Sequence, residues 1–277
     1  RIPINACCWP SKPQRTDLHQ LVLHQQSKLI LNHAMVGKGV CFDSGGLNLK
    51  PSTGIKEMHM DKHGAASVLS AFETIVNLGL PVNVTASRDL SKTLLMTMPT
   101  DLWTLLNQEK DSRCKLEILM LKEGWFWLID ELDSGKIQGK DLIELSTLTG
   151  AIVMALGKKH AGLFSNSDEL SQKLLETGNL MDKNYGECQW IRIIMKRKGQ
   201  NCRYLQCPWQ TISFSSQAAA FLENFVEKDV KWAHIDIAGT SNIDSDATGY
   251  GARLLVEYLK DQFDQIDRFL YLVNPLD

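Results

Sequence analysis

The sequence MVGKGVCFDSGG, residues 35–46, joins a short apolar strand to a polar turn. Apolar residues dominate positions 35–42, which predicts a buried strand, and the paired glycines 45 and 46 permit a tight turn and a close approach of another backbone. Two charged residues interrupt this pattern: Lys38 lies inside the strand and Asp43 lies at its end. Because buried strands rarely carry charges without a partner, we expect the turn to form a wall of a binding site.

Helices and short strands alternate along the rest of the chain. Apolar residues recur at helical spacing over 64–78 and stop at Gly79, a good C-cap, after which 80–84 starts the next strand. The later elements that we expect are strands at 141–145 and 232–237, and helices at 151–156, 217–226 and 252–259. This alternation predicts an α/β fold with a largely parallel sheet covered on both faces. Ligand sites in such folds gather at the carboxyl ends of the strands.

Length and composition limit the classes of function. The 277 residues suit one large α/β domain with some decoration. Lys and Arg number 30 against 32 Asp and Glu, without a basic stretch that could follow a phosphate backbone, so we expect no nucleic-acid partner. The longest strongly apolar window, 151–156, is far shorter than the roughly 20 residues of a membrane helix. The first residues contain no apolar core of signal-peptide length, so we expect a cytoplasmic protein without a membrane partner.

Three charged residues point to a metal site. Taken singly, Lys38 suits an edge strand, and Asp61, which precedes the predicted helix, suits a helix N-cap. Taken together with Asp43, they place two carboxylates and a lysine on adjacent loops. This set suits a hard or borderline divalent ion, whose field would neutralise the lysine so that its amine can bind the metal. Lys50, just past the glycine turn, is left to act as a cation on a developing oxyanion.

At these residues a family resemblance becomes specific. The string 36–46, followed by Lys50-Pro51, Met60-Asp61 and Gly64-Ala65-Ala66, resembles the leucine (cytosol) aminopeptidase family. Later blocks that also resemble this family lie at 147–151, 155–157, 233–240 and 248–251. The similarity runs in three patches, 35–86, 130–181 and 215–262, which together cover somewhat over half of the chain.

The resemblance implies an architecture and an activity. It implies a three-layer α/β/α catalytic domain at 35–265, between an unassigned segment at 1–34 and a C-terminal tail at 266–277. It also implies a homohexameric metallo-aminopeptidase, a hydrolase that removes N-terminal residues of leucine type from peptide substrates with two divalent metal ions, zinc, manganese or magnesium. A metal pair lowers the pKa of a bridging water and polarises the scissile carbonyl; by anchoring the free amino group, it confines cleavage to the N-terminus.

The roles carry over by motif, residue by residue. Lys38, Asp43 and Asp61 would be metal ligands, and Lys50 would be the catalytic cation that faces the tetrahedral intermediate. Thr147 and Leu148 would form part of the substrate wall.

One block of the family pattern is missing. In the family, Asn-Thr-Asp-Ala-Glu-Gly-Arg-Leu supplies two more carboxylates and an arginine; here ILMLKEGWFWL, residues 118–128, takes its place. Plausible codons for the family block, read from the second base, encode this run in order and without a gap. Six of the seven tryptophans and six of the seven cysteines lie outside the matching patches. We therefore interpret 87–128 and 182–214 as segments translated out of frame.

The missing block leaves alternatives open. Without it the second metal loses anionic ligands, and the chain would hold one ion or none. Glu123 takes the position of the family's glutamate when residues are counted back from Asp130, which makes it a candidate replacement ligand. The alternative to an active enzyme is a pseudoenzyme that serves as a binding or subunit-association module. A third interpretation, a dinucleotide-binding domain, rests only on glycines near a strand end and lacks the spaced glycine fingerprint.

Overall fold

The computed structural model describes residues 5–7, 19–25, 32–44, 50–93, 141–185, 189–192, 214–223, 226 and 229–273. The run at 118–128, with the candidate ligand Glu123, lies outside these residues. So do Gly45 and Gly46 of the predicted turn and most of the segment 182–214.

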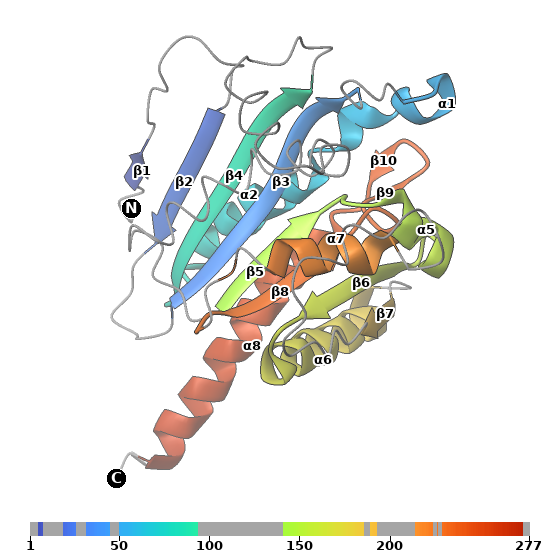
Figure 1. The fold of residues 1–277 in the computed structure, drawn as a ribbon. Coiled ribbons are helices and arrows are strands. Elements are labelled where there is room, and N and C mark those ends of the chain that lie inside the picture. Colours follow the sequence, from blue (N-terminus) through green and yellow to red (C-terminus); the bar gives the residue numbers. More distant parts are fainter. Residues whose placement is uncertain are drawn as a thin grey trace.

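Among the described residues, eight strands form one sheet in the order β1-β2-β4-β3-β5-β8-β6-β7 (Figure 1). The central strands β4, β3, β5 and β8 run parallel to one another, as do β6 and β7, whereas the pairs β1–β2, β2–β4 and β6–β8 are antiparallel. The strands are β1 (Asn5–Cys7), β2 (His19–Gln25), β3 (Asn32–Asp43), β4 (Asn83–Thr93), β5 (Asp141–Ser146), β6 (His160–Ser165), β7 (Gln189–Arg192) and β8 (Lys231–Asp236).

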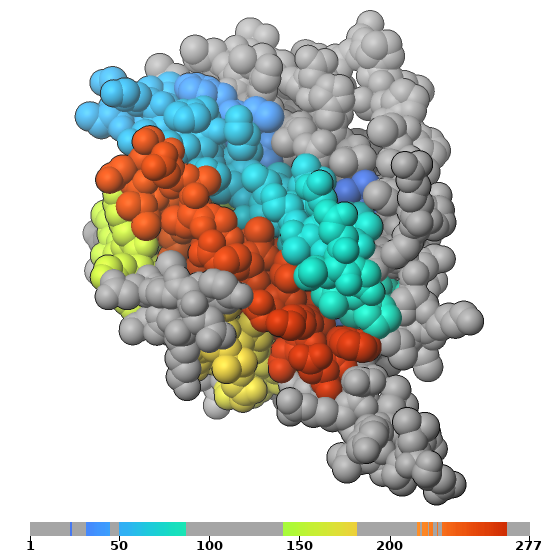
Figure 2. Space-filling model, turned by 180° about the vertical axis from the view of Figure 1, so that it is seen from behind, coloured from blue at the N-terminus to red at the C-terminus, as the bar shows by residue number. Residues whose placement is uncertain are grey.

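Helices cover both faces of this sheet, so the predicted three-layer α/β/α fold is confirmed. One face carries α2 (His63–Leu78), α6 (Asp168–Tyr185) and α8 (Tyr250–Val273), which lie together in Figure 2. The other face carries α5 (Gly150–Leu156) and α7 (Phe214–Glu223). The remaining elements are α1 (Ser52–Ile55), the 3-10 turn η1 (Met58–Met60), and the hairpin strands β9 (Asn242–Ile243) and β10 (Asp246–Ala247). In the described part of the chain, every helix is too short or too polar to cross a lipid bilayer.

The alternation of side chains along the strands builds two apolar cores. Met35, Ile143 and Ile235 pack with the helices α2, α6 and α8. Leu142 and Trp232, each an odd number of positions from the core residue of its own strand, pack on the opposite face with α5 and α7. Since successive side chains of a strand point to opposite faces, the even-numbered positions of β3, β5 and β8 all face α5 and α7. This assignment matters because four polar or charged residues of these strands, Lys38 of β3, Glu144 of β5, and His234 and Asp236 of β8, occupy even positions.

Several observed elements differ from the predicted ones. The C-cap at Gly79 is confirmed, with a left-handed φ of 64°. The expected strand start at Leu80 is wrong: the Leu80 amide donates to the Ile75 carbonyl and completes the cap, so β4 begins only at Asn83. Helix α7 begins at Phe214 and ends at Glu223, and α8 continues to Val273, across the expected start of a tail at 266.

The structure also contains elements that no sequence pattern predicted. The segment 1–34 contributes β1, β2 and the first residues of β3 to the central sheet. Strand β6 and helix α6 were not predicted, although Leu170, Leu174 and Met181 of α6 lie at helical spacing and pack into the core. Strong polarity between these three apolar residues hid the pattern.

The buried His33 makes stability depend on pH. Its side chain is 2% exposed, and burial lowers its pKa from the ordinary 6.5, as the charge of Lys173 also does, although Asp141 at 3.7 Å opposes the shift. The folded state therefore favours neutral His33. The stability that neutral His33 contributes is fully present above the pKa that His33 has in the unfolded chain. It is lost as the pH falls from that value toward the lower pKa of the folded state, because the unfolded chain binds the proton first.

Between about pH 7.5 and about pH 5.5 we expect His33 to lower the free energy of unfolding, so His33→Gln should lose less stability than the parent over this range. Urea unfolding of both chains at the two pH values measures the difference. If the free energy of unfolding changes by the same amount between the two pH values in the parent and the variant, His33 is not the group responsible.

Candidate functional site at the carboxyl edge of the sheet

Two glycines bring helix α2 onto the carboxyl edge of the sheet. A Cβ on Gly37 of β3 would lie 2.5 Å from the carbonyl oxygen of Gly64, closer than real Cβ contacts come. A Cβ on Gly64 would collide with the Leu145 carbonyl at the end of β5 and lie 2.9 Å from the Lys38 amide nitrogen. The first turn of α2 therefore rests directly on the backbones of β3 and β5, and Asp61, just ahead of this turn, is placed over Lys38.

Asp61, Lys38 and Thr147 form one hydrogen-bonded group. Lys38 Nζ donates to Asp61 Oδ1 at 2.7 Å and to the Thr147 carbonyl at 3.1 Å. The Thr147 hydroxyl donates to the same Asp61 Oδ1 at 2.8 Å. The three residues come from β3, the turn before α2 and the loop after β5, so the group joins three segments that are distant in sequence.

The second carboxylate oxygen of Asp61 is the unusual atom of this group. Asp61 is 6% exposed, and its buried Oδ2 has no hydrogen-bond partner among the described residues. Burial raises the pKa of the Asp61 carboxyl above its ordinary value, against the charge and hydrogen bond of Lys38 and the hydrogen bond of Thr147. The charge of Asp43 raises this pKa further, which places Asp43 within electrostatic reach. A buried anionic oxygen without a donor is suited to a cation, because leaving it unpaired costs free energy.

Asp43 and Lys50 form a second pair at the same edge. Lys50 Nζ lies 3.0 Å from Asp43 Oδ2, and both side chains are partly exposed. The Lys50 amide donates to the Ser44 carbonyl at 2.9 Å, which brings the two ends of the glycine turn together. A register shift between Val40 and Phe42, where β3 pairs with β4, marks a bulge just before Asp43; bulges re-aim side chains near strand ends. The sequence suggested that Lys50 is free, but in the structure it is paired with Asp43. Its role as a catalytic cation stays a prediction.

A buried carboxylate–imidazole pair lies below the site on the α5 and α7 face. His234 Nδ1 and Glu144 Oε2 are 2.6 Å apart, and neither side chain is exposed by more than 1%. The two residues are register partners on the adjacent strands β5 and β8. Burial lowers the pKa of His234, but the charge and hydrogen bond of Glu144 and the charge of Asp236 outweigh it, so the pKa lies above its ordinary value.

Asp236, at the end of β8, is a site residue that the sequence analysis did not single out. Its carboxylate is fully buried and binds the loop that contains the predicted substrate residues Thr147 and Leu148. The sequence did contain a signal, because a central parallel strand with His234 and Asp236 at alternate positions is unusual. Its meaning depends on the pairing of β5 with β8, which no local pattern gives.

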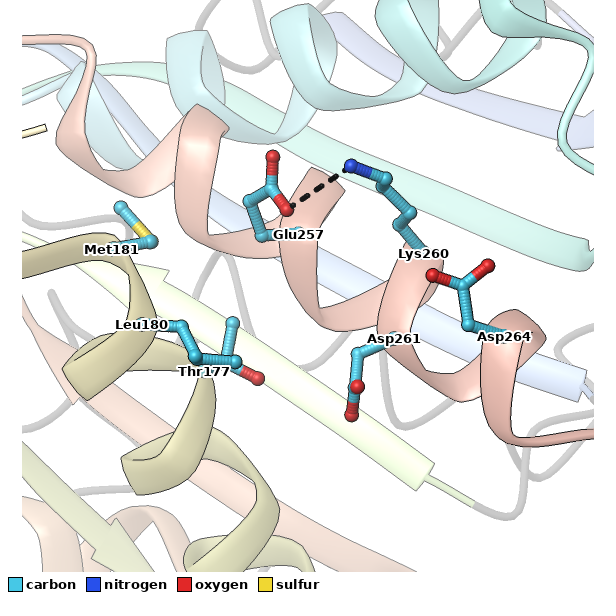
Figure 3. Close-up of a pocket in the computed structure, with 7 residues that line it drawn as sticks. All are labelled: Thr177, Leu180, Met181, Glu257, Lys260, Asp261 and Asp264. Atoms are coloured by element: carbon cyan, nitrogen blue, oxygen red, sulfur yellow. Dashed lines mark ion pairs between the residues drawn. The ribbon is translucent and has the colours of Figure 1, made fainter. Parts of the chain in front are cut away.

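A groove lies elsewhere, between α6 and α8 (Figure 3). Its volume is about 130 Å³, and it is lined by Thr177, Leu180, Met181, Glu257, Lys260, Asp261 and Asp264. Tyr258, between these α8 residues, donates to Asp141, the first residue of β5. The groove is therefore at the amino end of the strands, opposite the charged site.

The donors at the carboxyl edge fit a cation only in part. In the described ranges, no three His, Cys, Asp or Glu side chains gather in a way that could hold a metal ion. The set that does gather there is one lysine with two aspartates. Asp61 Oδ2 has no hydrogen-bond partner among the described residues. Carboxylate oxygens suit the hard and borderline ions magnesium, manganese and zinc.

The fold and the site together define an α/β protein with a cluster of charged residues where its parallel strands end. Residues 13–256 match the model of the family described as "Cytosol aminopeptidase family, catalytic domain". The chain belongs to this family, which confirms the resemblance found in the sequence. The family is one of metallo-aminopeptidases.

Curated relatives carry the same family name. The chain is 39% identical over 250 residues to a probable cytosol aminopeptidase of Chlorobium limicola, covering 85% of this chain and 48% of that protein. It is 36% identical over 244 residues to one of Chloroherpeton thalassium, covering 82% of this chain and 46% of that protein. The chain thus spans about half the length of the curated relatives it matches.

A solved structure shares the fold. The bottromycin maturation enzyme BotP, in complex with Mn, superposes with a TM-score of 0.67 and 28% identity, over 89% of this chain and 56% of that chain. A second structure of BotP gives a TM-score of 0.65 at 27% identity, over 89% of this chain and 55% of that chain.

Proposed function

We propose that this chain carries the site of a metal-dependent aminopeptidase that hydrolyses N-terminal residues, of leucine type, from peptides. The family's two-metal mechanism would be retained here with the ligands of one ion, Lys38, Asp43 and Asp61. The observation that carries the proposal is the buried Asp61 Oδ2, which has no partner among the described residues and lies beside Lys38. The family membership supports the reaction class, and the position of the group at the carboxyl edge of the sheet suits a substrate site.

Lys38, Asp43 and Asp61 would hold the metal, zinc, manganese or magnesium. A bound divalent ion supplies an activated water and polarises the scissile carbonyl. For Lys38 to bind through its amine, it must release a proton and its hydrogen bond to Asp61. Asp43 must likewise turn from Lys50, which frees the Lys50 ammonium to face the oxyanion. Thr147 and Leu148 would line the substrate.

A second candidate is an inactive module that binds peptides or associates with other subunits. One observation favours it: the family's second acidic block is replaced by the apolar run 118–128. The manganese-bound relative supports a metal in either case, because fewer carboxylates weaken a site without abolishing it. A cytosolic location and a hexameric assembly are part of the same proposal.

Hydrolysis of a leucine anilide, with manganese or zinc added, separates the two candidates. We expect metal-dependent turnover in the parent chain and a loss of about a hundredfold in Lys50→Ala, the scale for removing one stabiliser of an oxyanion. Lys56→Ala removes an exposed lysine nearby and should retain the parent's rate. Turnover that does not depend on Lys50 would refute the assigned mechanism. Metal binding without turnover would support the inactive module.

A further inference from the structure

We propose that Asp236 is a positioning residue: its buried carboxylate fixes the segment 147–149, and this segment holds Lys38 and Asp61 in the geometry of the candidate metal site. The part of the proposal that concerns metal affinity rests on the proposed function. The part that concerns the segment rests on the contacts alone.

Four hydrogen bonds converge on the Asp236 carboxylate. Its Oδ1 accepts from the amides of Leu148 and Ala238, each at 3.1 Å. Its Oδ2 accepts from the Thr149 amide at 3.1 Å and from the Thr149 hydroxyl at 2.7 Å. Three of these four donors belong to Leu148 and Thr149, so one side chain of β8 determines the path of the chain as it leaves β5.

The Thr149 hydroxyl extends this network to the α5 and α7 layer. It lies 2.6 Å from Ser215 Oγ in α7 and accepts from the Ile152 amide at 3.3 Å, which makes it the N-cap of α5. Because the single Thr149 hydroxyl proton is given to Asp236, the Ser215 hydroxyl must be the donor to Thr149. The segment is therefore held from the sheet and from two helices.

The same segment also holds Lys38 and Asp61 in place. Thr147 directly precedes the two anchored residues, and its carbonyl and hydroxyl hold Lys38 and Asp61, respectively. A hydrogen bond of 2.8 Å from the Ile237 amide to the Ser146 carbonyl holds the residue on its other side. Thr147 is thus fixed on one side by Asp236 of β8 and on the other by Ile237, which follows β8, and a shift of the anchored residues moves both contacts of the site.

The chemistry requires a carboxylate at position 236. All four partners are donors, two to each oxygen, so an amide at this position would turn its NH₂ group toward two donors. The Thr149 hydroxyl could reverse and accept from this group, but the Thr149 backbone amide would keep no acceptor, so a hydrogen bond would be lost and a buried donor left unsatisfied. Asp236→Asn keeps the shape of the side chain while it breaks the anchor, which makes it the appropriate test.

Two readouts test the proposal on the full chain. Hydrogen exchange without metal should be about tenfold or more faster at the Leu148 and Thr149 amides in Asp236→Asn, while amides in the middle of β3 and β5 stay protected. Manganese titration should show a dissociation constant raised by about tenfold to a hundredfold, the usual cost of losing a residue that orients metal ligands. Asp141→Asn, at the other end of β5, is the matched control and should change neither quantity.

A second pair of variants keeps the test decisive if Asp236→Asn does not fold. Thr149→Val removes the hydroxyl at nearly constant volume and should also speed exchange and weaken manganese binding, whereas Thr149→Ser retains the hydroxyl and should restore both. Unchanged exchange at 148 and 149 in the Asp236 and Thr149→Val variants would overturn the proposal. So would faster exchange with unchanged manganese affinity. A parent chain that binds no manganese would refute the proposed function, and the exchange rates would then decide this proposal alone.

Discussion

Gly64→Ala should destabilise the chain by about 3 kcal/mol, at the upper end of the usual cost of overpacking a buried position. The added methyl group would collide with the Leu145 carbonyl and lie 2.9 Å from the Lys38 amide nitrogen. Both neighbours are backbone atoms of the central strands β5 and β3 and cannot rotate away. The first turn of α2 must therefore move off the sheet, and Asp61 moves with it, so we also expect weaker manganese binding.

Gly150→Ala provides the matched control. Gly150 begins α5, and nothing lies within 4 Å of a Cβ built there. Urea unfolding of the two variants and the parent measures the difference in the free energy of unfolding. A Gly64→Ala chain as stable as Gly150→Ala would show that α2 does not rest directly on the backbones of β3 and β5.

Asp61→Asn should weaken manganese binding by about a hundredfold or more while the fold persists. Loss of residues that merely orient metal ligands already costs tenfold to a hundredfold, and here a charged ligand itself is removed. The asparagine oxygen can still accept from Lys38 and Thr147, and the buried charge is gone, so the hydrogen-bonded group should survive. Calorimetric titration with manganese, together with circular dichroism, measures both expectations.

The control for this variant is Asp264→Asn. Asp264 lines the acidic groove between α6 and α8, a competing place for a cation on the same molecule (Figure 3). We expect the parent's manganese affinity in Asp264→Asn. If Asp264→Asn weakens binding and Asp61→Asn does not, the ion binds in the groove, and the assignment of the metal site is wrong.

Local patterns predicted the parts of the fold that local physics determines. The helical spacing at 64–78 and the glycine at 79 predicted α2 and its cap, because residues close together in sequence determine the apolar face of a helix and its left-handed C-cap. The apolar run at 35–42 located β3 for the same reason. The segment 1–34 could not be assigned, since β2 is defined by its pairing with β4, far along the chain.

The site residues also divide into those that local patterns predict and those that depend on pairing between distant segments. Lys38 and Asp61 were expected to meet, and they do, because strand ends and helix starts share one edge in a parallel α/β fold. The pairing of Lys50 with Asp43 depends on how closely residues 44 and 50 approach, which no local pattern gives. The anchoring role of Asp236 depends on β5 lying beside β8, whose partners are about ninety residues apart in sequence.

Manganese broadening of the amide NMR signals of the intact chain tests the central claim most directly. A paramagnetic ion broadens the signals of the residues nearest to it. Substoichiometric manganese should therefore first remove the signals of Lys38, Asp43, Asp61 and Thr147. Loss of the signals of Glu257 and Asp261, with those of the carboxyl edge unchanged, would contradict the claim that Lys38, Asp43 and Asp61 form the metal site.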